Sequence, residues 1–370
     1  MSTHSVAIPS LVLNPIVSSK KSIRIIPQNN SVEYKEKKTA LQICVVGLGA
    51  QNTQDHLPAL MASLNVEICA VVDSDQEKVF AWSQKLNVPG FVSVDQMLSE
   101  ILPEAAVVAV PHDQYLPIIV QLANHGVHIL KEKPLARSFG EASDIVSLVK
   151  SSKIKLMVAV QRRFKATCRA FEENALLIGI PRILEARYTL NAGKRTVGWR
   201  ANKNVSGGGC LIDMGYHIID LLIWYFGLPD SVAAIVSCKA FPNIVYEAED
   251  TAIIIANYKQ TGLVCNITIS DCMAPKTEYL LLTGTDGSLR LERDRLILFD
   301  SNMIEVKQIN IQINDFTADQ LGHFVQVAQG RSQNPCAPEY HMQHMAFIEA
   351  CYLSASSKKY IDPHDVMCVA

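Results

Sequence analysis

The sequence predicts an α/β protein in which a doubly wound parallel sheet is followed by an α+β domain on an open, mostly antiparallel sheet. Three observations support this fold class. Apolar strands alternate with helical segments up to about residue 160, longer strands of alternating polarity follow, and 370 residues exceed the usual size of one domain. The expected units are an N-terminal extension (1–40), a first domain (41–162) and a second domain (163–370).

The first domain is expected to contain five strands that are buried on both faces. Each is a nearly continuous apolar run, which is typical of a parallel sheet covered by helices on both sides. The runs are LQICVVGLGA (41–50), VEICAVVDSD (66–75), EAAVVAVP (104–111), GVHILKEKP (126–134) and KIKLMVAV (153–160). Segments of helical period, such as 76–86 and 114–126, lie between them.

The second domain is expected to form one open sheet with one face in water. Polar and apolar residues alternate along its strands, and short turns such as Thr-Asp-Gly at 285–287 join them. The strands are expected at 182–191, 231–240, 250–258, 263–270 and 278–292, and a final helix at 339–356. Because the apolar alternate positions of an open sheet need cover, we expect a homodimer or homotetramer.

Composition excludes several classes of function. A formal net charge of −2 leaves no electrostatic footprint for nucleic acid, and no apolar run is long enough to span a membrane. The ten cysteines are scattered without a C-x-x-C pair, which favours the reducing cytoplasm and argues against a zinc site. Residues 1–40 show no steady period and no secretory signal. A transit peptide stays open although the stretch is not Arg-rich, and we expect a flexible or loosely docked extension.

The first strand runs into a glycine turn that is typical of dinucleotide binding. Gly47 allows the tight bend, and Gly49 lets the backbone approach a pyrophosphate at the start of the next helix. The third glycine position of the G-x-G-x-x-G pattern holds Asn52, which implies a wider helix–strand contact or a different first turn. Asp73 ends the second strand, where an acid binds the ribose of NAD and repels the extra phosphate of NADP; its other reading is a helix N-cap.

The fourth strand ends in clustered charge, HILKEKPLA at 128–136. Ligands of a doubly wound sheet bind beyond the carboxyl ends of the strands, so Glu132 and Lys133 are expected beside the nicotinamide end of a cofactor. A surface salt bridge would be the simpler reading of an isolated Glu-Lys pair. NAD is the expected cofactor, with NADP possible. The expected cofactor-binding residues are Gly47, Gly49, Ala50, Gln51, Asn52, Asp73, Pro111, Glu132 and Lys133.

A second chemically distinctive stretch is SGGGCLIDMGYHIIDLLIWYFG at 206–227. It reads as an apolar helix on which Asp213, His217 and Asp220 share one face. A buried core histidine is one interpretation of His217. A general base oriented by a carboxylate fits the pattern better, whereas a metal site lacks a third ligand at a suitable spacing.

Together these segments resemble the glucose–fructose oxidoreductase / inositol dehydrogenase (Gfo/Idh/MocA) family. The matching pieces include VVGLGAQNTQDHLPAL, AVVDSD, VAVPHDQY, GVHILKEKPLA, GGGCLIDMGYHIIDLL and TGTDGSL, in the family's order over residues 41–357. Glu-Lys-Pro followed some 80 residues later by D-x-x-x-H-x-x-D is the specific part. Two positions depart from the pattern: Asn52 replaces a small residue, and Tyr115 stands where many members have histidine.

The resemblance implies an NAD(P)-dependent dehydrogenase with a Rossmann domain, acting on a secondary alcohol of a sugar, inositol or related polyol. Lys133 and His217 would be the catalytic pair, with Asp213 holding the substrate or the imidazole. His217 would take the hydroxyl proton while Lys133 stabilises the developing alkoxide. Further substrate-pocket candidates are Arg163, Trp199, Arg200 and Tyr115, although Trp199 also fits a core position.

Other functions remain open at this point. A ligand sensor without activity could use the same fold, because fold does not determine function. A reductase of a linear or heterocyclic substrate, of the biliverdin or imine type, is a second alternative, but such proteins generally lack the Asp-His helix. A glycosidase that uses NAD transiently has no separate support in the sequence.

Overall fold

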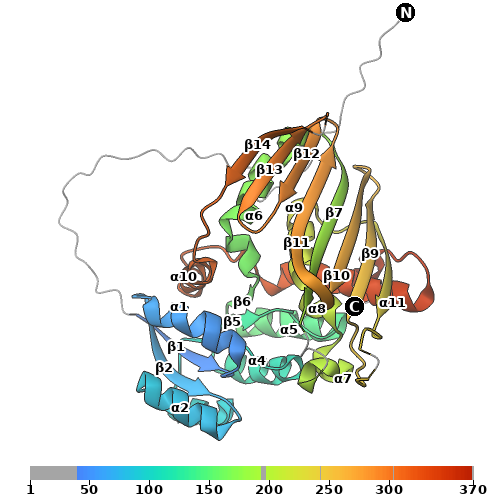
Figure 1. Ribbon diagram of the computed structural model, residues 1–370. Helices are drawn as coiled ribbons and strands as arrows, with labels where there is room; N and C mark the ends of the chain where they lie inside the picture. The colour runs from blue at the N-terminus through green and yellow to red at the C-terminus, as the bar shows by residue number, and fades with distance from the viewer. Residues whose placement is uncertain (1–39, 193–196, 242, 303, 369–370) are drawn as a thin grey trace, which may run out of the picture.

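The computed structural model describes residues 40–192, 197–241, 243–302 and 304–368. The N-terminal extension expected at residues 1–40 therefore lies almost wholly outside the described residues. Two sheets dominate the structure, and they occupy separate parts of the molecule (Figure 1).

The first sheet has six parallel strands in the order β3-β2-β1-β4-β5-β6. They are β1 (Leu41–Val46), β2 (Val66–Val72), β3 (Gly90–Phe91), β4 (Ala105–Val108), β5 (His128–Glu132) and β6 (Leu156–Ala159). The order reverses beside β1, so the crevice of this sheet opens beyond the carboxyl ends of β1 and β4. The predicted doubly wound sheet is confirmed, and the two-residue β3 was too short to be anticipated.

Five α-helices accompany the first sheet. They are α1 (Leu57–Ala62), α2 (Gln76–Leu86), α3 (Val94–Glu100), α4 (Tyr115–Asn124) and α5 (Phe139–Ser152). The strands between them are almost completely buried, because helices cover both faces of the sheet. The β-branched and aliphatic runs of the sequence therefore become the core that holds the strand ends in place.

The second sheet has eight strands in the order β14-β13-β12-β11-β7-β10-β9-β8. They are β7 (Pro181–Asn191), β8 (Ser231–Ser237), β9 (Thr251–Tyr258), β10 (Leu263–Ser270), β11 (Cys272–Gly284), β12 (Gly287–Leu291), β13 (Arg295–Asp300) and β14 (Glu305–Asn310). Only the pairing of β7 with β10 is parallel, so the predicted mostly antiparallel sheet is confirmed. The sequence analysis did not anticipate β13 and β14, at one edge of the sheet.

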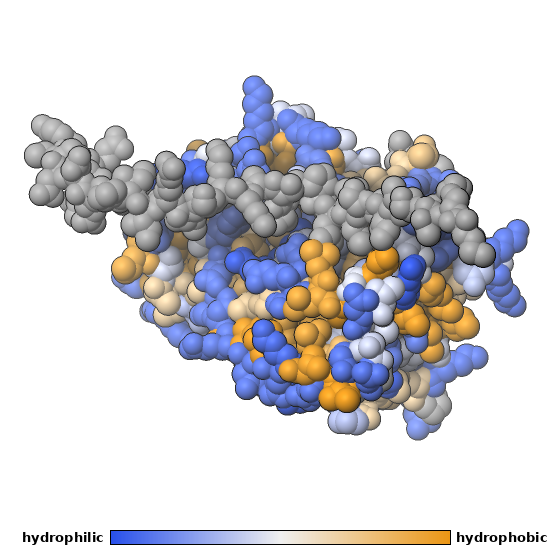
Figure 2. All heavy atoms as spheres, turned by 90° about the horizontal axis from the view of Figure 1, so that it is seen from above, coloured by the Kyte–Doolittle hydropathy of each residue, from blue (hydrophilic) through white to orange (hydrophobic). Residues whose placement is uncertain are grey.

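The two faces of the second sheet differ. The inner face packs against helices, whereas the outer face carries exposed apolar side chains. Five of these lie on adjoining strands: Ile183, Ile235, Ile253, Ile255 and Val264. Figure 2 shows apolar side chains gathered in patches on the side of the molecule viewed there.

Helices from the second half of the chain connect the two sheets. The long α11 (Pro338–Ser357) packs against α5, β8 and α9 (Tyr216–Phe226), while α10 (Phe316–Ala328) contacts α1 (Figure 1). The predicted final helix is confirmed to within a residue at each end. The other α-helices of the described residues are α6 (Ala166–Asn174), α7 (Lys203–Ser206), α8 (Cys210–Asp213) and α12 (Pro363–Cys368).

The single helix expected over 206–227 was wrong. The helix is interrupted at Met214 and Gly215, and the segments 203–213 and 216–226 meet at a bend of 54°. Gly215 permits this bend because a Cβ there would lie 2.3 Å from the carbonyl oxygen of Leu211. Over the described ranges no single helix is long and apolar enough to cross a membrane, although these two bent segments together pass that test by length and composition.

Candidate active site

The glycine turn after β1 has the geometry that a dinucleotide requires. Gly47 has a φ of +87°, and a Cβ there would lie 2.2 Å from the carbonyl oxygen of Ala109, so only glycine fits. A Cβ on Gly49 would meet nothing within 4 Å, which leaves the backbone open on that side. The residues of this turn therefore fit the pyrophosphate of NAD.

Asn52 replaces the third glycine by a hydrogen-bonded link. Its side chain is fully buried, and Nδ2 donates to the carbonyl oxygens of Val46 (3.0 Å) and Gly47 (2.6 Å). The residues from Asn52 to His56 form one π-helical turn. Of the two alternatives from the sequence, the different first turn is the one that the structure shows.

Asp73 lies at the end of β2 beside the glycine turn. Its Oδ2 accepts a hydrogen bond from the backbone N–H of Leu48 (2.6 Å), and Oδ1 accepts one from Asp75 (2.9 Å). The N-cap of α2 is Asp75 rather than Asp73, so the alternative reading of Asp73 as a cap was wrong. Lys78 lines the same part of the cleft, a cation that the sequence analysis overlooked because it lies one helical turn away.

A cleft of about 690 Å³ runs along the carboxyl edge of the first sheet. Most of the predicted site residues line it: Gly47, Gly49, Ala50, Gln51, Asp73, Pro111, Tyr115, Glu132, Lys133, Trp199, Arg200 and Asp213. Three predicted residues do not, namely Asn52, Arg163 and His217. The cleft thus joins the glycine turn to the charged end of β5.

Lys133 and Asp213 meet at the inner end of this cleft. The Lys133 ammonium contacts the Asp213 carboxylate and donates to its main-chain oxygen at 2.9 Å. Arg200 Nε lies 3.1 Å from the other carboxylate oxygen, and the Arg200 guanidinium stacks 4.2 Å above the Trp199 ring. Asp213 therefore holds two cations that face the cofactor cleft.

The two residues that precede Lys133, Lys131 and Glu132, are both charged residue types and both buried. Glu132 Oε1 lies 2.8 Å from His56 Nε2 on the first helical turn. Lys131 is fully buried, where its ammonium contacts the carbonyl oxygens of Glu132 and Pro134 and lies 3.4 Å from the centre of the Tyr115 ring. Burial lowers the pKa of Lys131 well below its usual range. Tyr115 therefore lines the cleft and also supports the residue behind the turn.

His217 lies on α9 and is not among the residues that line the cleft. Its side chain is partly exposed, and its Nδ1 is buried without a hydrogen-bond partner among the described residues. Burial, and then the charges of Arg162 and Lys133, lower the pKa of His217 well below its usual value, against the opposing charge of Asp213. Because the helix breaks between them, Asp213 holds Lys133 and Arg200 in place of the imidazole.

Arg163 belongs to a separate buried cluster. Its Nε and Nη2 donate to the Asp220 carboxylate at 2.7–3.1 Å, and His344 Nε2 lies 2.8 Å from the same carboxylate. Burial raises the pKa of Asp220, but Arg163 and His344 outweigh it and hold the pKa below its usual range. Asp220, His341 and His344 have metal-ligand spacing, yet a cation there would meet the guanidinium of Arg163. The cluster is therefore better explained as a structural ion pair.

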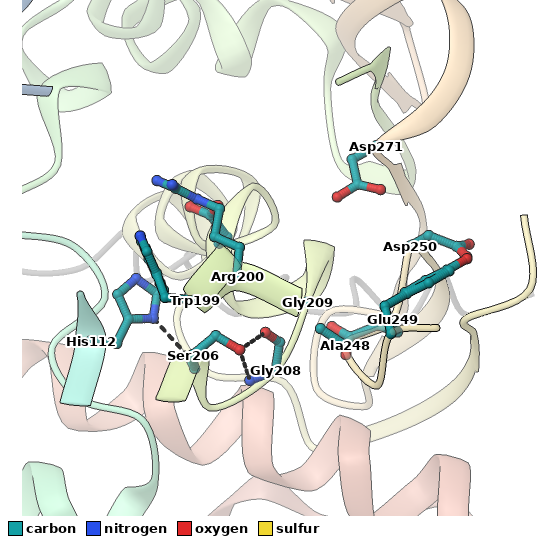
Figure 3. Close-up of a pocket in the computed structure, with 12 residues that line it drawn as sticks. His112, Trp199, Arg200, Ser206, Gly208, Gly209, Ala248, Glu249, Asp250 and Asp271 are labelled. Atoms are coloured by element: carbon teal, nitrogen blue, oxygen red, sulfur yellow. Dashed lines mark hydrogen bonds and ion pairs between the residues drawn. The ribbon is translucent and has the colours of Figure 1, made fainter. Parts of the chain in front are cut away.

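The sequence analysis missed His112, which directly follows Pro111. Its side chain is 4% exposed and lines both the cleft and a small adjoining cavity. Nδ1 lies 2.6 Å from the carbonyl oxygen of Ser206, and the ring meets Trp199 edge-on with centroids 4.7 Å apart (Figure 3). A histidine directly after Pro111, a few residues past the end of β4, was the available signal.

Comparison with known proteins agrees with this site. A model described as "Oxidoreductase family, NAD-binding Rossmann fold" (GFO_IDH_MocA) matches residues 41–160, and the GFO/IDH/MocA C-terminal domain matches residues 174–290. The chain belongs to the Gfo/Idh/MocA family. Residues 41–160 are accordingly an NAD-binding Rossmann domain, and the resemblance found in the sequence is confirmed.

Similarity to individual Gfo/Idh/MocA relatives is moderate. An uncharacterised oxidoreductase of Schizosaccharomyces pombe is 30% identical over 213 residues, which cover 55% of this chain and 56% of that protein. The trans-1,2-dihydrobenzene-1,2-diol dehydrogenase of Mus musculus is 25% identical over 263 residues, covering 68% and 74%. Matches to three curated relatives span 56%, 63% and 64% of their lengths.

The fold matches solved structures over most of the chain. An oxidoreductase from Agrobacterium radiobacter, crystallised with NAD+, L-tartaric acid and magnesium, superposes with a TM-score of 0.78. That match covers 89% of this chain and 100% of the other, at 17% sequence identity. The arrangement of Rossmann domain and antiparallel sheet is therefore shared.

Proposed function

We propose that the protein is an NAD-dependent dehydrogenase that oxidises a secondary alcohol of a sugar, an inositol or a related polyol, with NADP as the weaker cofactor. The observation that carries the proposal is the contact of Lys133 with Asp213, which brings an ammonium from β5 and a carboxylate from α8 to one end of the NAD cleft. The family match and the similarity to a mouse diol dehydrogenase support the same class of reaction.

Lys133 has the chemistry to bind the reacting oxygen of the substrate. NAD, when bound in this cleft, supplies the hydride acceptor. As an alcohol is oxidised its oxygen gains negative charge, and a positioned ammonium stabilises that charge more in the transition state than in the ground state. Asp213 orients Lys133 for this role and links it to Arg200 at the entrance of the adjoining cavity.

His217 remains the proposed proton acceptor. Its lowered pKa keeps the imidazole neutral at pH 7, which is the form that can accept a proton. Lys133 and Asp213 both affect its charge state, which supports a common neighbourhood for the three groups. Loss of the Lys133–Asp213 pair would change the electrostatics around His217, so we expect the three side chains to act as a unit.

We also propose that the outer face of the second sheet joins two copies of the chain. Its exposed isoleucines and valine form the kind of apolar surface that monomers rarely leave uncovered. Ile253→Lys should shift the mass measured by light scattering towards the monomer. Leu64→Lys, which changes an exposed apolar residue at the end of α1, is the control and should leave the mass unchanged.

A substrate panel tests the dehydrogenase proposal. The full chain would be assayed by NADH absorbance with D-glucose, D-xylose, myo-inositol and trans-cyclohexane-1,2-diol, with NAD and with NADP. We expect reduction of NAD by at least one polyol, and loss of turnover by about two orders of magnitude in Lys133→Met without a comparable loss of NADH affinity. Lys150→Met, an exposed residue on α5, is the matched control.

The outcomes separate the competing functions. Normal turnover in Lys133→Met would remove Lys133 from the mechanism. Tight NADH binding with no polyol oxidised, in either cofactor, would favour a sensor. Oxidation of NADH by an imine or a tetrapyrrole, with no polyol activity, would favour a reductase of a substrate other than a sugar.

A further inference from the structure

His112 occupies a position that the proposed chemistry does not yet use. It begins the short helical turn His112–Gln114 after β4, between the cofactor cleft and the small adjoining cavity. That cavity is also lined by Trp199, Arg200 and Asp213. His112 therefore borders both the cofactor cleft and the adjoining cavity, beside Arg200 and Asp213.

The hydrogen bond to Ser206 determines which ring nitrogen of His112 carries the proton. A main-chain carbonyl oxygen only accepts hydrogen bonds, so the 2.6 Å contact requires a proton on Nδ1. Burial lowers the pKa of His112 to about 3, which keeps the ring neutral at pH 7. In a neutral ring with Nδ1 protonated, Nε2 is a hydrogen-bond acceptor.

The second ring nitrogen of His112, Nε2, is free to accept a hydrogen bond from a ligand. Figure 3 shows the second ring nitrogen of His112 turned away from Ser206, on the side of Trp199 and Arg200. It has no hydrogen-bond partner among the described residues, and it is not one of the atoms sealed from solvent without a partner. The edge contact with Trp199 and the bond to α7 hold the ring in this orientation.

We propose that His112 is a substrate-binding residue whose Nε2 accepts a hydrogen bond from a second hydroxyl, on the carbon next to the one that is oxidised. This inference rests on the proposed dehydrogenase function and narrows its substrate to compounds with two adjacent hydroxyl groups. In a sugar or polyol the group that can donate to this acceptor is a hydroxyl, whereas a carbonyl, carboxylate or phosphate oxygen offers it no proton.

His112 is not proposed as the proton acceptor of the reaction. Its Nδ1 is bound to the carbonyl oxygen of Ser206, and its Nε2 is assigned to the second hydroxyl and not to the one that is oxidised. It is suited to recognition, because a site built to bind a hydroxyl discriminates against an analogue that lacks it.

The test compares substrates that differ by one hydroxyl group. The NAD-bound full chain and its variants would be assayed with trans-cyclohexane-1,2-diol against cyclohexanol, and with D-glucose against 2-deoxy-D-glucose. For the parent protein, kcat/KM should be about tenfold or more higher for the member of each pair that has the additional hydroxyl. One hydrogen bond contributes a binding free energy of that size. His112→Phe should bring that ratio close to one, mainly through KM, while activity on the partner with one hydroxyl fewer changes little.

His125→Phe is the matched control, because it alters an exposed ring at the end of α4 and should leave both activity and ratio unchanged. A ratio in His112→Phe equal to that of the parent would overturn the inference. So would an equal loss of activity on both members of a pair, since that result indicates a structural role. Recovery of part of the ratio in His112→Gln would support a hydrogen-bonding role.

A second measurement does not depend on turnover. Nitrogen NMR of the histidine-labelled, NAD-bound protein should show His112 as a neutral ring with the proton on Nδ1, and trans-cyclohexane-1,2-diol should shift its Nε2 signal. A proton on Nε2, or no shift at saturating diol, would overturn the inference. If no alcohol is oxidised, the dehydrogenase proposal fails, and the Nε2 shift still decides whether His112 binds a diol.

Discussion

The buried ring of His112 should make the protein less stable in acid by an amount that can be calculated. An unperturbed imidazole has a pKa of 6.5, whereas burial lowers the pKa of His112 to about 3 in the folded protein. Below pH 6.5 the unfolded chain binds a proton that the folded protein does not bind, so stability falls with pH. Between pH 7 and pH 5 this difference amounts to about 2 kcal/mol for the one ring.

Substitution of His112 isolates that contribution from all other titrating groups. The free energy of unfolding would be measured by urea denaturation at pH 7 and pH 5 for the parent, His112→Phe and His112→Asn. Neither replacement titrates in this range. Both variants should therefore lose about 2 kcal/mol less unfolding free energy than the parent between the two pH values, whatever their stability at pH 7.

Equal losses in all three proteins would refute the reasoning. That result would mean that the folded protein takes up the proton on His112 as readily as the unfolded chain, and that the ring is not held neutral. His217, His341 and His344 also have lowered pKa values, chiefly through burial, so the parent should lose further stability in the same direction.

Three other substitutions have clear expected outcomes. Asn52→Gly should lower the free energy of unfolding in urea by about 2 kcal/mol, because the Gly47 carbonyl loses the Asn52 donor and the Val46 carbonyl keeps only the N–H of Ala109; an unchanged value would contradict the assigned link. Asp73→Ser should narrow the ratio of the NADP and NAD dissociation constants about tenfold in fluorescence titrations; a ratio equal to the parent's would show that Asp73 does not select the cofactor. Arg163→Met should cost about 3–5 kcal/mol in urea, because the buried Asp220 carboxylate loses its guanidinium, whereas a loss under 1 kcal/mol would show that the pair is not needed.

Much of the architecture could be predicted because its signals are local. Continuous apolar runs indicate strands that are buried on both faces, and alternation indicates strands with one wet face; both sheets confirmed these patterns. The signal failed where it was weak or absent. The edge strand β14 is almost fully exposed, so no apolar pattern marks it. The break at Gly215 depends on contacts with Leu211 and Ile269, which helical periodicity does not record.

In the site, too, some features had a local sequence signal and others did not. Residues at strand ends, such as Lys133 and Asp73, were identified because the carboxyl edge of a parallel sheet collects its ligands. The partners of the side chains were not predictable. Arg163 was a substrate candidate from the family resemblance, yet in the fold its guanidinium binds Asp220 and does not line the cleft. Lys131 looked like part of a charged strand end, but it is buried against Tyr115.

The sequence by itself determined the two-sheet architecture, the NAD-binding turn and the charged end of β5, because short-range patterns of apolar, glycine and charged residues encode each of them. Only the tertiary structure decided which charges pair. Asp213 meets Lys133 from 80 residues away, and His112 is held by a carbonyl 94 residues further along the chain. Such pairings depend on the relative positions of packed elements, and no pattern within one segment specifies those positions.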